Sequence, residues 1–180
     1  MLTLKYHLTE DEYFDYHYFT TWSAPEKRRY RIKYYSWVLI FYTGVAALYI
    51  FSKQAHNVWV DLTIFSLIGI TYILFVPYLI RRSVRVRVKD ILSQPENSHV
   101  LSAAEVILMD TGILDKDTVS ESKYEWDAIV KKAETPNSYY LYTNSYHAIV
   151  IPKRLLNNSQ DREELNRLFN EYLPLATMVA

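Results

Sequence analysis

Two long apolar segments, joined by a short connector, constrain this chain more than any other feature of its sequence. The first, residues 34–51, contains no charged residue, and the second, residues 58–80, contains only Asp61. The hydrocarbon core of a bilayer is about 30 Å thick, so a helix needs roughly 20 apolar residues to cross it. A helix on the surface of a soluble protein has a polar face, and neither segment has one. The sequence therefore predicts a two-helix transmembrane hairpin.

A buried helical hairpin in a soluble protein is the alternative interpretation of these segments. It is disfavoured because a chain of 180 residues has little else with which to cover two helices that are apolar all round. The hairpin with its flanks is expected to occupy residues 24–90.

Clusters of basic residues flank the hairpin and predict its orientation. Because Lys and Arg are retained on the cytoplasmic side during insertion, we expect both termini in the cytoplasm. The connector contributes only Lys53. The clusters also suit binding to anionic lipid, although retention during insertion explains them without a further function. They consist of Lys27, Arg28, Arg29, Arg31 and Lys33 before the first span, and of Arg81, Arg82, Arg85, Arg87 and Lys89 after the second.

The N-terminal residues 1–23 predict a strand followed by a short helix. Apolar and polar residues alternate over residues 2–8, which is the period of a strand. Thr9 and Glu12 have the spacing of a capping box, which marks the start of a helix. After the second span, residues 81–97 are ambiguous: the alternation of Val and Arg favours a strand, whereas continuity with a membrane helix favours a helix until Ser93.

Residues 98–175 predict a small, mainly β domain that ends in a helix. An amphipathic helix with Ser159 as its N-cap closes the domain. Several short antiparallel strands followed by one helix is the order of a pleckstrin-homology (PH)-like fold, and the N-terminal strand is placed to complete the sheet. The fold class is therefore α+β. The expected β segments are Val100 with residues 106–109, then 113–119, 124–133, 139–142 and 148–151, with turns at 110–112, 135–138 and 143–145.

The whole chain resembles the YcxB-like family of bacterial membrane proteins. The resemblance rests on LTLKYHLTEDEYFDYHYF at the N-terminus, the basic entry into a two-span hairpin, and the C-terminal elements ILMDTGILDKD, YEWDAIV and IPKR in that order. It implies a PH-like domain anchored in the bacterial cytoplasmic (inner) membrane. It supplies no catalytic residues.

The sequence offers no constellation for catalysis, a cofactor or a metal, so we expect a protein that is not an enzyme. It has no cysteine, only three glycines and no phosphate-binding glycine motif, and its five histidines lack the helical spacing of a zinc site. Nucleic-acid binding is also disfavoured, because from residue 90 onward fourteen acidic residues face eight Lys or Arg.

Four residues are candidates for function. Trp126 suits a partner-binding groove or, more simply, core packing. Lys153 and Arg154 suit contact with a phosphate or an acidic partner, or with solvent alone. Asp61, an ionisable residue in a membrane span, is a functional candidate by default, but its place near the outer end also fits an interfacial residue.

The expected function is a membrane-anchored, non-catalytic module that binds a protein partner or organises a membrane complex. Membrane lipids and one unidentified protein are the expected partners, and self-association through the hairpin is a further expectation. Two other functions stay open: immunity or resistance against a membrane-active toxin, and an accessory role in a transporter that uses Asp61.

Overall fold

The computed structural model describes residues 1–52, 57–173 and 178–179. It divides into two compact units, which are the hairpin unit (Glu26–Val86) and the α+β unit, formed by Met1–Pro25 together with Arg87–Ala180. The predicted α+β class is confirmed, since two long apolar helices accompany two antiparallel sheets and a C-terminal helix. Lys53 and the predicted boundary at residue 175 lie outside the described residues.

The hairpin unit contains α2 (Arg28–Ser52) and most of α3 (Val58–Ser93). Both helices are long and apolar enough to cross a membrane, and only 6% of the residues in each apolar stretch are buried. Within this structure the two helices are therefore largely uncovered. The ambiguous segment after the second span is helical as far as Ser93. Extending an existing helix adds one hydrogen bond per residue without a new nucleus, which outweighs the short Val/Arg alternation.

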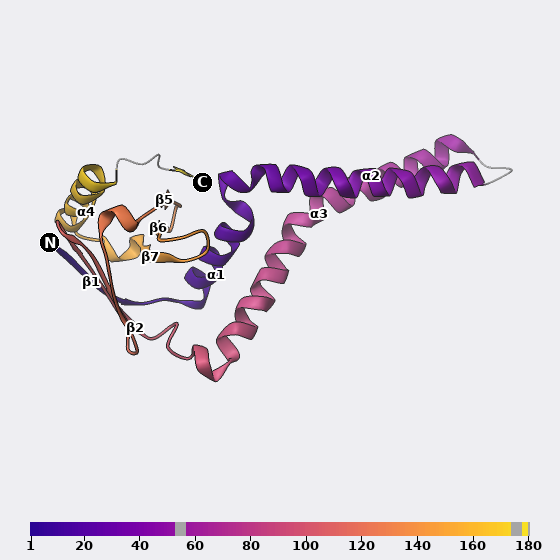
Figure 1. Ribbon diagram of the computed structural model, residues 1–180. Coiled ribbons are helices and arrows are strands. Elements are labelled where there is room, and N and C mark those ends of the chain that lie inside the picture. The colour runs from indigo at the N-terminus through magenta and orange to yellow at the C-terminus, as the bar shows by residue number, and fades with distance from the viewer. Residues whose placement is uncertain (53–56, 174–177, 180) are drawn as a thin grey trace. The chain divides into compact units, whose positions relative to one another are not determined.

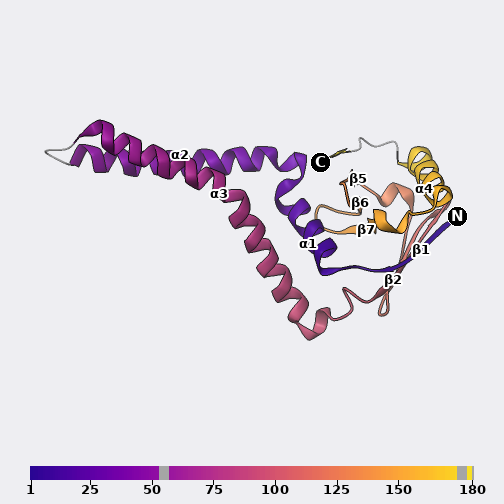
Figure 2. The ribbon, with the colours of Figure 1, turned by 180° about the vertical axis from the view of Figure 1, so that it is seen from behind.

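The α+β unit draws its elements from both sides of the hairpin (Figures 1 and 2). Before the hairpin stand β1 (Leu2–His7), α1 (Glu10–Tyr18), the π-helical turn η1 (Phe19–Ser23) and the 3-10 turn η2 (Pro25–Lys27), whose last two residues are counted with the hairpin unit. After it stand η3 (Pro95–Asn97), β2 (Ala103–Met109), β3 (Gly112–Lys116), β4 (Glu121–Tyr124), η4 (Trp126–Ala128), β5 (Lys131–Glu134), β6 (Ser138–Tyr142), β7 (Ala148–Pro152), η5 (Lys153–Leu155), α4 (Ser159–Tyr172) and β8 (Met178–Val179).

The first sheet has the antiparallel order β1-β2-β3-β4. Its first two strands come from opposite sides of the hairpin, and they pair over six residues, from Leu2 opposite Leu108 to His7 opposite Ala103. The alternation in β1 buries Leu2, Leu4 and Tyr6 against the core. The expectation that the N-terminal strand completes the sheet is confirmed.

The second sheet has the order β7-β6-β5, with the short β8 parallel to β5. Its side chains alternate between two separate cores. Leu141 and Ile151 face the main core, which they share with the first sheet and α4. Tyr140 and Tyr142 face the other way, where Tyr16 of α1 and Phe19 of η1 cover them. The N-terminal arm (Met1–Pro25) therefore adds a strand to one sheet and a cover to the other.

Several strand boundaries differ from those expected. Val100 lies in a turn, and the first strand after the hairpin begins at Ala103. The strand expected over 113–119 ends at Lys116, because the Asp117 carboxylate accepts hydrogen bonds from the backbone N–H groups of Val119 and Ser120 and closes a turn. The segment expected over 124–133 is broken by the η4 turn.

The predicted cap of the C-terminal helix is wrong by one residue. Asn158, rather than Ser159, is the N-cap, and its side-chain oxygen accepts a hydrogen bond from the backbone N–H of Gln160 at 3.1 Å. Either residue type serves as a cap, so the sequence alone favours neither. The expected capping box of α1 is confirmed, with reciprocal bonds between Thr9 and Glu12.

Gly112→Ala is expected to destabilise the α+β unit. The residue has φ +141°, and an added Cβ would lie 2.3 Å from the carbonyl oxygen of Tyr124. Alanine in such a conformation costs more than about 1 kcal/mol, so thermal unfolding of the full chain in detergent, followed by tryptophan fluorescence, should begin several degrees earlier. Gly44→Ala is the matched control, because a Cβ there meets nothing within 4 Å. Equal midpoints for both variants would contradict the proposed geometry of this turn.

Candidate functional site

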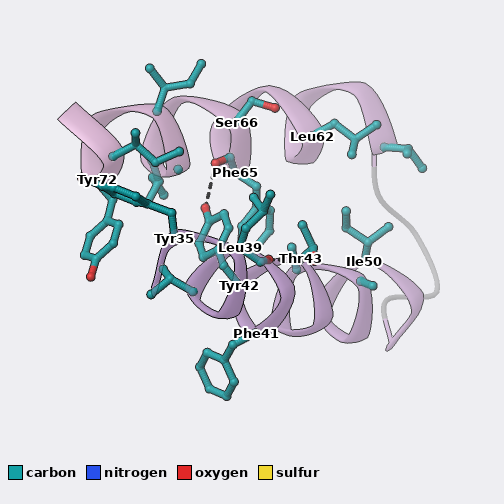
Figure 3. Close-up of a pocket in the computed structure, with 18 of the residues that line it drawn as sticks. Tyr35, Leu39, Phe41, Tyr42, Thr43, Ile50, Leu62, Phe65, Ser66 and Tyr72 are labelled. Atoms are coloured by element: carbon teal, nitrogen blue, oxygen red, sulfur yellow. Dashed lines mark hydrogen bonds between the residues drawn. The ribbon is translucent and has the colours of Figure 1, made fainter. Parts of the chain in front are cut away.

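The side chain of Tyr42 links the two helices of the hairpin (Figure 3). Its hydroxyl group donates a hydrogen bond of 2.7 Å from α2 to the carbonyl oxygen of Phe65 in α3. Gly69 makes room for the ring, since a Cβ at this position would lie 3.2 Å from Tyr42. Further along, the hydroxyl groups of Tyr34 and Tyr72 are 3.1 Å apart and fix the same antiparallel register.

A groove of about 920 Å³ lies between the two helices. Ala46 and Ala47 are small members of its lining, while leucine, isoleucine, valine and phenylalanine make up most of the rest. The lining residues with hydroxyl groups are Tyr35, Tyr42, Thr43, Ser66 and Tyr72. The hydroxyl groups of Tyr42 and Thr43 donate to the backbone carbonyl oxygens of Phe65 and Leu39, and that of Tyr72 lies 3.1 Å from the Tyr34 hydroxyl.

The predicted basic residues lie on the helices at the end of the hairpin that is opposite to the connector. Those before the first span lie in η2 and the first turns of α2, and those after the second span lie in the C-terminal half of α3. The pairing of Tyr34 with Tyr72 places residues 28–33 of α2 level with the part of α3 that follows residue 72. The structure thus brings Lys33 and Arg81, far apart in sequence, to the same end of the hairpin unit.

Asp61 lies at the other end, in the first turn of α3. Its backbone N–H donates to the carbonyl oxygen of Asn57 at 3.1 Å, so the residue belongs to the start of the helix. A carboxylate is stabilised at a helix N-terminus by the helix dipole. Asp61 is half-buried and does not line the groove. This position agrees with the interfacial interpretation, and a functional role for Asp61 stays a prediction.

Trp126 lies inside the main core of the α+β unit and is only 6% exposed. Its indole N–H donates a hydrogen bond of 2.9 Å to the carbonyl oxygen of Met109, and its ring stacks on Tyr172 with centroids 5.4 Å apart. The indole N–H group and the ring are therefore both in contact with other residues of the fold. The geometry favours packing, and a partner-binding role stays a prediction.

Lys153 and Arg154 have acidic partners within the chain. The Lys153 Nζ atom lies 2.6 Å from Glu134 and 4.7 Å from the centre of the Tyr139 ring. The Arg154 Nε atom lies 2.6 Å from Glu12, and its guanidinium group also donates to the carbonyl oxygen of His7. Arg154 thereby fastens the N-terminal arm to the segment after β7. The spacing of the capping box pointed to Glu12, but no sequence signal paired it with Arg154.

Asp115 is a further, partly buried titratable group of the α+β unit. Burial raises the pKa of the Asp115 carboxyl, and the nearby His147 opposes this rise. A hollow of about 300 Å³ near the end of the first sheet is lined by Tyr6, Ala104 and their neighbours, but not by Asp115. Within the described residues, no three His, Asp or Glu side chains are grouped so that they could hold a metal ion.

Glu12 makes the attachment of the N-terminal arm sensitive to pH. Partial burial tends to raise the pKa of Glu12, but hydrogen bonds from Arg154 and from the Thr9 backbone outweigh it and lower the pKa below its ordinary value of 4.5. A lowered carboxyl pKa stabilises the folded state above the ordinary pKa, and this contribution is lost as the pH falls through the folded-state value.

Glu12→Gln should therefore lower the unfolding midpoint of the full chain at pH 7 by a few degrees, as expected for a partly exposed pair worth about 1 kcal/mol. The difference from the unchanged protein should shrink at pH 3.5. Glu163→Gln, at an exposed position on α4, is the control. A difference that is the same at both pH values would show that the charge of Glu12 does not stabilise the arm.

Comparison with known proteins gives one family match. The model of the YcxB-like protein family matches residues 108–169, which run from the end of β2 to the last turns of α4. None of the curated proteins or solved structures compared with the chain matches it. The hairpin and the N-terminal arm lie outside the matched segment. The resemblance to the YcxB-like family is thus confirmed over residues 108–169, the part of the α+β unit that contains Trp126, Lys153 and Arg154.

Proposed function

We propose that this chain is a non-catalytic, membrane-anchored module that holds a protein partner at the cytoplasmic face of the bacterial inner membrane. The hairpin crosses the membrane twice and serves as the anchor. The α+β unit is the part presented to the partner. Its strand order, with four and three antiparallel strands followed by a helix, supports a PH-like assignment.

The observation that carries this proposal is that the hairpin interrupts a single fold. β1 and α1 precede the hairpin, yet they pair with β2 and cover β6, which follow it. The chain therefore leaves the α+β unit at Pro25 and returns to it at Arg87. A segment that starts and ends in one folded unit, and that crosses a membrane, must cross it an even number of times. Two spans satisfy this requirement.

The charge distribution supports the cytoplasmic orientation. Both ends of the hairpin carry Lys and Arg clusters, which are retained in the cytoplasm during insertion. Together with the interrupted fold, this predicts that the connector alone lies on the outer side. The excess of acidic residues from residue 90 onward disfavours flat binding of the α+β unit to anionic lipid and leaves its surface open to a protein.

Several features favour binding over catalysis. Two ion pairs join segments of the fold, one between Lys153 and Glu134 and one between Arg154 and Glu12. The α+β unit leaves large apolar side chains at Val119, Val130 and Tyr146, which are 70%, 59% and 75% exposed and lie outside both cores. Exposed apolar side chains offer contact points to a protein partner.

Single-cysteine variants test both halves of the proposal, because the natural chain has no cysteine. In intact cells, a membrane-impermeant maleimide should label Asn57→Cys, beside the connector, and should label Thr3→Cys and Asn144→Cys only after the membrane is permeabilised. All three positions are exposed, so accessibility within the fold does not separate them. Labelling of Thr3→Cys and Asn57→Cys from the same side would contradict the two-span anchor.

The same approach tests for a protein partner. Cysteines at Val119 and Tyr146, carrying a photoactivatable maleimide in native membranes, should form an adduct with one protein. Glu163→Cys on α4 is the control position and should form none. If all three positions gave the same weak mixture of crosslinked products, the result would contradict a specific partner.

A further inference from the structure

We infer that the groove between α2 and α3 is a binding site for the acyl chains of an anionic phospholipid, whose headgroup lies at the basic end of the hairpin. This inference rests on the proposed membrane insertion of the hairpin and adds to it a defined ligand site. The volume of about 920 Å³ lies within the range of roughly 300–1,000 Å³ that is typical of small-molecule pockets.

The groove lies where a large side chain stands between the two helices. Tyr42 of α2 has its ring against Gly69 and its hydroxyl bonded to the carbonyl oxygen of Phe65 (Figure 3). The separation is set by a bonded aromatic side chain, so the space on either side of that side chain remains open.

The width and chemistry of the groove select the occupant. A helix with its side chains is roughly 10–12 Å across, whereas the Tyr42 side chain alone reaches from α2 to the backbone of α3. A slender, flexible hydrocarbon chain fits such a space better than a third helix does. The lining offers mainly aliphatic and aromatic carbon, and the hydroxyl groups of Tyr42 and Thr43 are engaged with backbone carbonyl oxygens. An apolar ligand therefore leaves the hydrogen bonds of Tyr42 and Thr43 intact when it enters the groove.

The charge at one end of the groove selects the headgroup. Tyr35 and Tyr72 line the groove on the side away from the connector, and Lys33 and Arg31 lie just beyond Tyr35 on α2. Arg81, Arg82 and Arg85 follow on α3, so the same end carries cations from both helices. Lys and Arg near the bilayer surface attract anionic lipid headgroups. The combination of an apolar groove and a cationic end matches phosphatidylglycerol better than phosphatidylcholine.

The test uses the purified full chain in nanodiscs that contain a phosphatidylglycerol with a photoactivatable group at the end of one acyl chain. After irradiation, mass spectrometry should locate the label on groove-lining residues of both helices. Ala46→Phe and the milder Ala47→Leu fill the groove and should reduce this labelling, by about tenfold for the larger residue, which corresponds to about 1.4 kcal/mol. Gly44→Phe is the matched control, because Gly44 is on the same helix, does not line the groove and has open space around it.

Each alternative result overturns the inference. Equal labelling in all variants, or labelling of Leu48, which is 75% exposed and outside the groove, would mean that only bulk lipid was in contact. Equal labelling by the matching phosphatidylcholine probe would exclude headgroup selection. Crosslinks between two copies through Ala47→Cys would identify a second hairpin as the occupant.

Extraction of the chain from native membranes by alkaline carbonate separates failure of this inference from failure of the anchor. Resistance to extraction together with unselective labelling would contradict the groove site but not the anchor, whereas release by carbonate would contradict both.

Discussion

The pairing of β1 with β2 is the interaction on which the rest of the structure depends. The two strands lie on opposite sides of a hairpin of some sixty residues, yet they form a continuous register from Leu2 to His7. The entropic cost of closing a loop rises only slowly with its length. The burial of the side chains of Leu2, Leu4 and Tyr6 compensates for this cost. Because of this pairing, both ends of the hairpin connect to the same folded unit, and the hairpin is not an anchor attached at one terminus.

Several contacts hold the N-terminal arm in place after this pairing. Tyr6 donates a hydrogen bond of 2.5 Å to the carbonyl oxygen of Val150, Tyr16 donates to that of Tyr146, and Arg154 holds Glu12. Burial raises the pKa of Tyr6, so its hydroxyl stays protonated and available as a donor. Each contact joins a residue before the hairpin to one near β7.

The sequence predicted the parts that have a local physical signature. Uncharged stretches specify the two long helices, Thr9 and Glu12 specify the start of α1, and alternation specifies β1. The turn at 143–145 between two short β segments specifies β6 and β7. It could not predict contacts between distant segments. Asn158 and Ser159 are equivalent as caps, the partner of Arg154 lies 142 residues away, and the two-sided burial of β6 requires knowledge of what covers each face. The groove was also missed, since it arises from the position of one tyrosine between two helices whose register no local pattern specifies.

Hydrogen exchange of the full chain in nanodiscs, read by mass spectrometry, tests the central claim that the hairpin interrupts one fold. The backbone amides of β1 should be as slow to exchange as those of β2 and β6, and a destabilising change in the second sheet should accelerate all of them together. Rapid exchange in residues 2–7, with β2 and β6 still protected, would show that the N-terminal arm is a separate and loosely attached segment, and would contradict the account.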